Sequence, residues 1–299
     1  MAFRRWSRSV TKTIGLVAAQ SKDEAAALAV EIGDWLLTRG CRVLDESQLV
    51  RERLPGVDAI IILGGDGLMM RAANTYPDVP LLGINFGKVG FLAMVERREW
   101  PEALEALLAG QFTIEEGATL EGAIERSGVT IDQGWAINDV VIRSGVRMID
   151  VEVYIDGHYV NTYPGDGMIV ATPRGSTAYC MAAGGPILTA GVHGFAIVPI
   201  SCHSPIRTPF VVAESTRIEL LLASRHESSL ILDGRPTTDL RYGDVVLVRR
   251  GEHAFRLISF SSTNFYEAFR SKFNFRIRPD AVPSRSASDR DTSDIVPEV

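Results

Sequence analysis

One segment of the chain, a short apolar run that leads into a glycine-rich turn, restricts the possible folds more than any other. Val57–Leu63 ends in five consecutive apolar residues, and residues 64–67 read Gly-Gly-Asp-Gly. A helix is predicted directly after this turn, from about Leu68 to Asn74. A continuous apolar strand is typical of a parallel sheet that is covered on both faces. We therefore expect an open, largely parallel α/β sheet in this part of the chain.

The segments on either side of this turn continue the alternation of strand and helix. Ile14–Ala18 and Leu81–Asn85 are short apolar runs that predict two more strands. Glu99–Leu108 has helical periodicity, and Gly110 lies where such a helix would end. The order of these elements supports an α/β domain in the first third of the chain.

Another helix is predicted after the first of these strands. Ser21 and Glu24 have the S-x-x-E spacing of a capping box, so we expect the helix to begin there. Gly40 follows the last apolar residue of the stripe and is expected to end the helix. The apolar residues that recur at helical spacing are Ala25, Leu28, Ala29, Ile32, Trp35 and Leu36.

From about Gln111 to Phe260 the pattern changes to many short strand-like runs that are separated by turn residues. Asp156-Gly157 lies between two such runs and predicts a tight hairpin. A helical stretch is expected near Ser176–Ala183. The predicted strands are Asn138–Arg143, Val151–Ile155, Met168–Thr172, Gly194–Ile200, Arg217–Leu222, Leu230–Leu232 and Val245–Arg249.

These patterns divide the chain into two domains with a flexible segment at each end. Residues 1–12 are expected to form a flexible leader, and residues 13–111 an α/β nucleotide-binding domain. Residues 112–261 are expected to form a β-rich domain. Residues 262–278 contain a helical pattern and are expected to pack back on the first domain. Residues 279–299 are rich in Ser, Asp, Pro and Arg and are expected to be disordered.

Composition excludes several functional classes. The net charge of −6 argues against binding to nucleic acid, which depends on neutralising phosphates. No apolar run reaches the length of a membrane span, and the basic N-terminus lacks the apolar stretch of a secretory signal. The three cysteines match no metal-ligand spacing, so we expect buried thiols without disulfides. A cytoplasmic protein with no membrane contact is expected.

Asp66 is the residue of the glycine-rich turn that carries chemical information. Ligands in open α/β sheets bind at the carboxyl ends of strands, and glycines there let the backbone approach a phosphate beside a helix N-terminus. A carboxylate at this place suits proton removal from an attacking hydroxyl, or coordination of Mg²⁺. The alternative is that Asp66 only caps the following helix.

Two further segments have the composition of a ligand site. Residues 165–179 combine a strand with a turn in which Thr172, Ser176 and Thr177 offer hydroxyl groups at a helix start. Asn138 and Asp139 precede a strand and together can hold the hydroxyls of a ribose. Each segment also has a plain structural explanation, because Ser, Thr and Asx residues commonly cap helices and form turns.

The order of these motifs resembles that of the NAD kinase family, over roughly residues 13–275. The stretch TPRGSTAY followed by AGGP is the most specific part of the resemblance, whereas GGDG also occurs in lipid and sugar kinases. The motifs are GGDG (64–67), GINFGKVGFL (83–92), NDVVI (138–142), GDGMIVATPRGSTAY (165–179), AGGPIL (183–188), PISCHS (199–204) and LDGRP (232–236).

The resemblance implies an α/β N-terminal domain, a β-rich C-terminal domain and an active site between them. It implies transfer of the γ-phosphoryl group of ATP to the 2′-hydroxyl of the adenosine ribose of NAD. Mg²⁺ would accompany the nucleotide phosphates, with no metal held by a direct protein ligand. Homodimers or homotetramers are expected.

The resemblance also assigns residues. Asp66 would be the general base, and Asp166 would contact the nicotinamide end, with a possible reach into a neighbouring subunit's site. The other residues expected to bind NAD are Gly64, Gly65, Gly67, Asn138, Asp139, Thr177, Ala178 and Tyr179.

Three positions depart from the family pattern. Leu68 replaces a Thr that would touch phosphate, Phe86 stands where Arg is frequent, and Arg174 replaces a small hydroxyl residue. Candidate phosphate contacts are Arg71, Lys88 and Arg174. Two alternatives follow, a non-catalytic NAD or nucleotide sensor and a lipid or sugar kinase that shares the GGDG turn.

Overall fold

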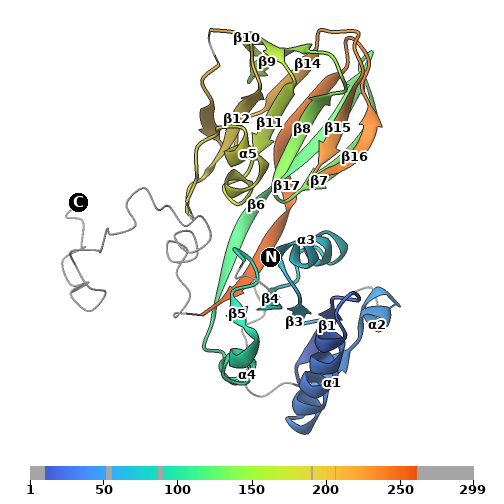
Figure 1. The fold of residues 1–299 in the computed structure, drawn as a ribbon, viewed down its shortest axis with the longest axis vertical. Coiled ribbons are helices and arrows are strands. Elements are labelled where there is room, and N and C mark those ends of the chain that lie inside the picture. The colour runs from blue at the N-terminus through green and yellow to red at the C-terminus, as the bar shows by residue number, and fades with distance from the viewer. Residues whose placement is uncertain (1–10, 52–55, 87–89, 190, 206, 261–299) are drawn as a thin grey trace, which may run out of the picture.

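The computed structural model describes residues 11–51, 56–86, 90–189, 191–205 and 207–260. The segments predicted to pack back on the first domain (262–278) and to form a tail (279–299) lie outside the described residues. So do residues 1–10 of the predicted leader. The described chain forms two lobes, an α/β lobe and a β-rich lobe, joined by two long strands (Figure 1).

The α/β lobe contains a parallel sheet in the order β4-β3-β1-β2. Its helices cover both faces: α1 and α4 pack on one face, and α2 and α3 on the other. The strands are β1 (Thr13–Ala18), β2 (Arg42–Leu44), β3 (Ala59–Leu63), β4 (Leu81–Asn85) and β5 (Val95–Glu96). The helices are α1 (Asp23–Thr38), α2 (Glu46–Arg51), α3 (Asp66–Thr75) and α4 (Trp100–Ala109).

The β-rich lobe is a sandwich of antiparallel sheets with one apolar core between them. The six-stranded sheet has the order β13-β12-β11-β8-β15-β16. The short helix α5 (Tyr179–Ala182) covers its other face. The strands are β7 (Val129–Ala136), β8 (Asp139–Ser144), β9 (Ile149–Ile155), β10 (His158–Gly165), β11 (Gly167–Ala171), β12 (Gly194–Ile200), β13 (Phe210–Ala213), β14 (Ile218–Leu222), β15 (Ser228–Leu232) and β16 (Arg235–Asp239).

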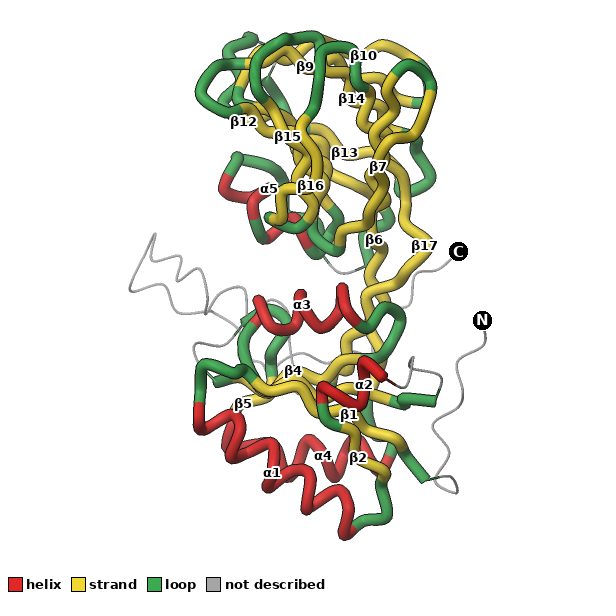
Figure 2. Tube along the Cα trace, turned by 90° about the vertical axis from the view of Figure 1, so that its right-hand side faces the viewer, coloured by secondary structure: helices red, strands yellow, loops and turns green. Residues whose placement is uncertain are grey.

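Two long antiparallel strands, β6 (Thr113–Arg126) and β17 (Val245–Ser259), run from one lobe into the other (Figures 1 and 2). Their pairing extends over nearly their full lengths, with one irregularity between Arg250 and Ala254. At its end β17 also pairs in parallel with β4, where Leu257 lies opposite Leu81. The sheets of the two lobes are therefore continuous through this strand pair.

Most of the predicted elements are confirmed. Four residues of the helix stripe are buried as expected, and its other two, Ala29 and Trp35, are half-buried. Gly40 and Gly110 adopt the left-handed conformation after their helices. The hairpin turn Asp156-Gly157 also has positive φ at both residues. The three cysteines are buried thiols. In the described residues, no helix has the length and apolar character that crossing a membrane requires.

The predicted capping box is wrong. The helix begins at Asp23 with Lys22 as its N-cap, and no side chain caps it. Glu24 instead pairs with Arg97 from the segment after β5, at 2.5 Å, so its carboxylate is directed to another element. Asp23 and Glu24 still favour this end of the helix, because negative charge is stabilising near a helix N-terminus.

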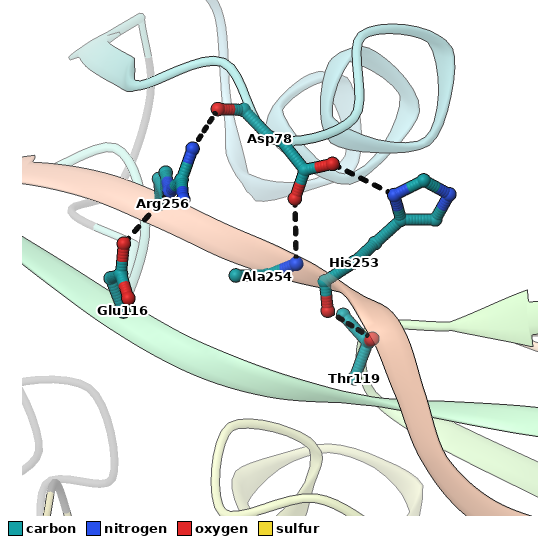
Figure 3. Close-up of polar contacts among 6 residues, drawn as sticks. All are labelled: Asp78, Glu116, Thr119, His253, Ala254 and Arg256. Atoms are coloured by element: carbon teal, nitrogen blue, oxygen red, sulfur yellow. Dashed lines mark hydrogen bonds and ion pairs between the residues drawn. The ribbon is translucent and has the colours of Figure 1, made fainter. Parts of the chain in front are cut away.

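A polar cluster fastens the loop between α3 and β4 to the strand that joins the lobes (Figure 3). The Asp78 carboxylate accepts hydrogen bonds from the Ala254 N–H at 2.8 Å and contacts the His253 ring at 2.8 Å. Arg256 donates to the Asp78 carbonyl and pairs with Glu116 of β6. The end of α3 is thereby tied to the irregular part of β17.

Asp78 gives a test of this attachment. Burial alone would raise the pKa of Asp78, but the hydrogen bonds from Ala254 and His253 and the charges of His253 and Arg256 hold it below its ordinary value. A carboxyl with a depressed pKa stabilises the fold above its unfolded pKa, and this contribution is lost as the pH falls through the folded pKa. Asp78→Asn should therefore lower the free energy of unfolding by about 1 kcal/mol near pH 7, and the difference should shrink below about pH 4.

Urea unfolding of the two proteins at several pH values measures this difference. Asp156→Asn is the matched control, because Asp156 also has positive φ and accepts one backbone N–H, from Arg217, in an exposed turn. An equal loss in both variants, or a loss at Asp78 that persists at low pH, would contradict the proposed attachment.

Candidate active site

Asp66 lies at the first residue of α3, at the carboxyl edge of the parallel sheet. Its carboxylate accepts hydrogen bonds from the backbone N–H groups of Phe91 at 3.0 Å, Leu92 at 3.0 Å and Ala93 at 3.2 Å. The loop after β4 therefore fixes the orientation of the carboxylate. A Cβ atom at Gly90 would overlap that carboxylate, so this position requires glycine.

The glycines around Asp66 leave room for a ligand. Gly65 is the N-cap residue of α3 in an extended conformation, and neither it nor Gly67 has another atom within 4 Å of the place where a Cβ would lie. Gly64 is different, because a Cβ there would lie 2.6 Å from the Leu68 side chain. Open space at Gly65 and Gly67 is what close approach of a phosphate to a helix N-terminus requires.

Asn138 and Asp139 lie where the chain enters β8, and an acidic turn holds them. The Asp233 carboxylate accepts N–H hydrogen bonds from Ile137 at 2.9 Å, Asn138 at 2.7 Å and Asp139 at 3.3 Å. The Asp139 side chain is 5% exposed, whereas that of Asn138 is half-buried. Burial, together with the nearby charge of Asp233, raises the pKa of Asp139 to about 7.

The turn that follows β11 packs directly against this pair. Gly175 lies so close to the Asn138 backbone that a Cβ would overlap it. The Thr172 hydroxyl donates to the Ile137 carbonyl at 2.7 Å and accepts the Gly175 N–H at 3.0 Å. The Ser176 hydroxyl accepts the Leu188 N–H at 2.9 Å.

These contacts correct the expectation that three hydroxyls of the turn are offered to a ligand. Thr172 and Ser176 are fully buried, and their hydroxyls hold the turn together instead. Thr177 donates to the Arg174 carbonyl at 3.2 Å and lines a cleft.

That cleft has a volume of about 450 Å³ and lies between the two lobes. The loop that binds Asp66 contributes Phe91 and Met94, and β6 contributes residues 115–118. The β-rich lobe contributes Pro173, Arg174 and Thr177, and the chain after the turn adds Leu188. The loop that binds Asp66 and the 172–179 turn thus line one cleft, and the charge of Asp66 acts on Arg174 inside it.

Arg174 places a positive charge in this cleft. Its guanidinium lies 4.5 Å from the centre of the Phe255 ring and 3.9 Å from the Glu115 carboxylate. Within the described residues its buried Nε has no hydrogen-bond partner. Burial lowers the pKa of Arg174, and the charges of Glu115 and Asp66 oppose that shift. A guanidinium held in this way suits an anionic ligand group.

Other predicted site residues lie elsewhere. Asp166 is exposed at the start of β11, about 20 Å along the strand from Thr172 given ~3.3 Å per residue. Arg71 pairs with Glu46 of α2 at 2.6 Å. Ala178 and Tyr179 follow Thr177 at the start of α5, where Arg143 lies 5.6 Å from the Tyr179 ring. Lys88 lies outside the described residues.

Sequence reasoning missed three residues that shape the site. Phe91 and Glu115 line the cleft, and Asp233 holds the Asn138–Asp139 segment. The only sequence signal for Asp233 was the LDGRP motif, whose Asp-Gly pair indicates a hairpin turn.

Phe86 has two basic side chains beside it. Lys22 donates to the Phe86 carbonyl at 2.6 Å, and the Arg97 guanidinium lies 5.2 Å from the centre of the Phe86 ring.

A glycine-rich turn with a carboxylate lies at the edge of a parallel sheet, and a β sandwich borders the nearby cleft that contains the buried Arg174. This arrangement is typical of a two-lobed phosphotransferase that binds nucleotides. Comparison with known proteins supports this class of protein. Residues 47–112 match the ATP-NAD kinase N-terminal domain, and residues 137–260 match the ATP-NAD kinase C-terminal domain. The chain belongs to the NAD kinase family.

Relatives of this chain match it along most of their length. An NAD kinase of Thermomicrobium roseum is 56% identical over 283 residues, which cover 95% of this chain and 98% of that protein. An NAD kinase of Syntrophotalea carbinolica is 36% identical over 281 residues, which cover 88% and 99%.

Two solved structures share the fold. Yeast NADH kinase complexed with NADH superposes with a TM-score of 0.82 at 18% identity, covering 93% of this chain and 91% of that one. An NAD kinase from Archaeoglobus fulgidus in complex with ATP superposes with a TM-score of 0.66 at 22% identity, covering 88% and 99%. The predicted fold class is confirmed.

Asp139 gives a pH-dependent test of the site. A carboxyl whose pKa is raised to about 7 in the folded chain binds its proton more tightly than in the unfolded chain. The resulting stability is fully present below about pH 4 and is lost as the pH rises through about 7. Asp139→Asn removes the buried charge, so it should raise the free energy of unfolding at pH 8 by about 2 kcal/mol and leave it nearly unchanged at about pH 4.

Chemical unfolding at about pH 4 and about pH 8 measures the effect, with Asp34→Asn on the exposed side of α1 as control. The assignment fails if the Asp139 variant is destabilised equally at both pH values.

Proposed function

We propose that this protein is an NAD kinase, which transfers the γ-phosphoryl group of ATP to the 2′-hydroxyl of the adenosine ribose of NAD and forms NADP. The observation that carries the proposal is one cleft lined both by Phe91, whose N–H binds the Asp66 carboxylate, and by the 172–179 turn. The family membership and the 56% identity to an NAD kinase support the same activity. A lipid or sugar kinase does not agree with that membership.

In this proposal each part of the cleft has a separate task. Asp66 accepts the proton of the 2′-hydroxyl. Hydrogen bonds from the N–H groups of Phe91, Leu92 and Ala93 keep its carboxylate in place as the hydroxyl attacks. Asn138 and Asp139 hold the adenosine end of NAD, and Thr177, Ala178 and Tyr179 line the dinucleotide pocket. Such catalysis rests mainly on positioning and charge stabilisation.

The proposed phosphate contacts use the open glycines beside Asp66 and the guanidinium of Arg174. Gly65 and Gly67 let a phosphate reach the backbone, and Arg174 supplies charge. We assign Arg71 and Lys88 only as further candidates, and Arg71 would have to leave Glu46 to take part. At position 68 a leucine offers no hydroxyl, so phosphate binding here relies more on backbone groups.

Mg²⁺ belongs to this proposal as a companion of the donor phosphates. In phosphoryl-transfer sites Mg²⁺ is usually held by substrate phosphates and one or two carboxylates, and Asp66 offers one carboxylate next to Phe91, which lines the cleft. The ion would neutralise charge on the transferred group.

Asp166 has a role only between subunits. It is exposed at the far end of β11, away from the cleft of its own chain. We therefore propose that it contacts the nicotinamide end of NAD in a neighbouring subunit of a homodimer or homotetramer. A cytoplasmic location stays a prediction.

Replacement of Asp66 tests the proposed chemistry. Asp66→Asn removes the proton acceptor but keeps the size of the side chain, so NADP formation from ATP, Mg²⁺ and NAD should fall at least about 100-fold. NAD binding, measured by calorimetry, should change only a few-fold. Asp23→Asn is the matched control, because Asp23 also lies in the first turn of a helix, α1, outside the cleft.

The outcomes separate the alternatives. Wild-type rates in Asp66→Asn would exclude the general-base role. NAD binding by the wild-type protein without any NADP would favour the non-catalytic sensor instead.

A further inference from the structure

The turn between β15 and β16 has a conformation that few residue types accept. Asp233 and Gly234 both have positive φ, at 50° and 74°, and the flanking residues Leu232 and Arg235 are paired. These features define a two-residue hairpin turn of the type that favours Asp-Gly. The turn therefore projects one carboxylate at a fixed place at the end of the hairpin.

That carboxylate binds the segment from which the proposed NAD site is built. Consecutive backbone N–H groups of Ile137, Asn138 and Asp139 all point at the Asp233 oxygens. In return, the Asp233 N–H donates to the Asp139 carbonyl at 3.1 Å. Successive N–H groups that converge on one anion fix the local backbone. The direction of the Asn138 and Asp139 side chains thus depends on a residue of another hairpin.

The same carboxylate also reaches the helix that carries Asp66. Asn74, near the end of α3, donates to the Asp233 carboxylate at 3.3 Å and accepts from the Arg235 guanidinium at 2.8 Å. Asn74 also donates to the Met70 carbonyl of its own helix at 3.0 Å. Asp66 lies eight residues earlier, about 12 Å away along a rigid helix. One helix therefore has the proposed base at one end and this contact at the other.

We propose that Asp233 and Asn74 are positioning residues for phosphoryl transfer. They set the distance between Asp66 on the α/β lobe and the Asn138–Asp139 segment on the β-rich lobe. The inference rests on the proposed function, since it presumes that these two groups act on one nucleotide. It adds two residues, Asp233 and Asn74, whose side chains act through others and need not touch the nucleotide.

Asp233 also has an electrostatic effect on the site. Its charge is the second cause, after burial, of the raised pKa of Asp139. Cys180 is another titratable group in this surrounding, and burial together with the charge of Asp139 raises the pKa of its thiol to about 11. Loss of the charge at position 233 therefore moves the titration of Asp139 toward lower pH, which a purely structural role of the turn would not do.

Two substitutions at Asp233 separate geometry from charge. Asp233→Gly accepts the positive φ but removes the acceptor, so KM for NAD should rise and kcat should fall, each by about tenfold as for other residues that support a binding residue. Asp233→Asn keeps the turn and one acceptor oxygen but removes the charge. Asp233→Asn should lower kcat/KM less than Asp233→Gly does, and it should shift the pH dependence of KM for NAD to lower pH.

Asn74→Ala tests the link between the lobes. It should lower kcat more than it raises KM for NAD, because the nucleotide site stays intact while Asp66 is displaced. The effects of Asn74→Ala and Asp233→Gly should not add in kcat/KM, since both break one contact. Asp156→Gly is the matched control, because Asp156-Gly157 is another hairpin turn with positive φ, distant from the cleft.

The results decide as follows. The inference holds if the Asp233 and Asn74 variants lose activity at unchanged melting temperature relative to Asp156→Gly, with a non-additive double variant. It is overturned if kcat and KM stay within twofold of wild type, or if each loss only follows a loss of stability. Calorimetric NAD binding keeps the test separate from the proposed function: a wild-type protein that forms no NADP refutes that function, whereas unchanged NAD affinity in Asp233→Gly refutes this inference.

Discussion

The antiparallel pairing of β6 with β17 is the constraint on which the rest of the structure depends. These two strands are continuous through both lobes, and β17 joins the parallel sheet through Leu257 opposite Leu81. The cleft lies beside this strand pair, because β6 provides residues 115–118 and β17 provides Arg250 and Ala254. The Arg174 guanidinium of the cleft lies 4.5 Å from the centre of the ring of Phe255, also on β17. Because the connection is a paired ribbon rather than a single linker, the two lobes have a defined relative position, with one irregular point between Arg250 and Ala254.

Helix α3 connects the relative position of the two lobes to the place of the proposed base, Asp66. Its first residue is Asp66, its last turn contacts Asp233, and the loop after it is tied to β17 through Asp78. Phosphoryl transfer demands little covalent chemistry from a protein, so most of the rate comes from placing a hydroxyl, a base and a phosphate correctly. A helix fixed at both ends meets this demand. The same reasoning explains why carboxylates and backbone N–H groups, rather than many basic side chains, dominate the interior of the site.

The local signals in the sequence were sufficient for the elements that depend on local chemistry. Gly40, Gly110 and Asp156-Gly157 have the backbone conformations that their types favour. Of the two long strands, β17 was predicted only over Val245–Arg249 and β6 was not among the predicted strands. Residues such as Glu115, Gly117 and Glu121 interrupt the alternation in β6, and pairing between distant segments stabilises both strands instead. The capping box failed for a similar reason, since Glu24 bonds to Arg97, which is remote in sequence.

The reactive group of the site could be predicted from the sequence, whereas the contacts that hold the surrounding turns could not. Asp66 and the Asn138–Asp139 pair stand in recognisable motifs, whereas the use of the Thr172 and Ser176 hydroxyls within the turn follows only from packing. The most direct measurement is a crystal structure of the protein with NAD and a non-hydrolysable ATP analogue. It should place the 2′-hydroxyl of the adenosine ribose within about 3.2 Å of an Asp66 oxygen, with the nucleotide in the cleft between the lobes. A ribose that binds outside this cleft, or with another hydroxyl facing Asp66, would contradict the account.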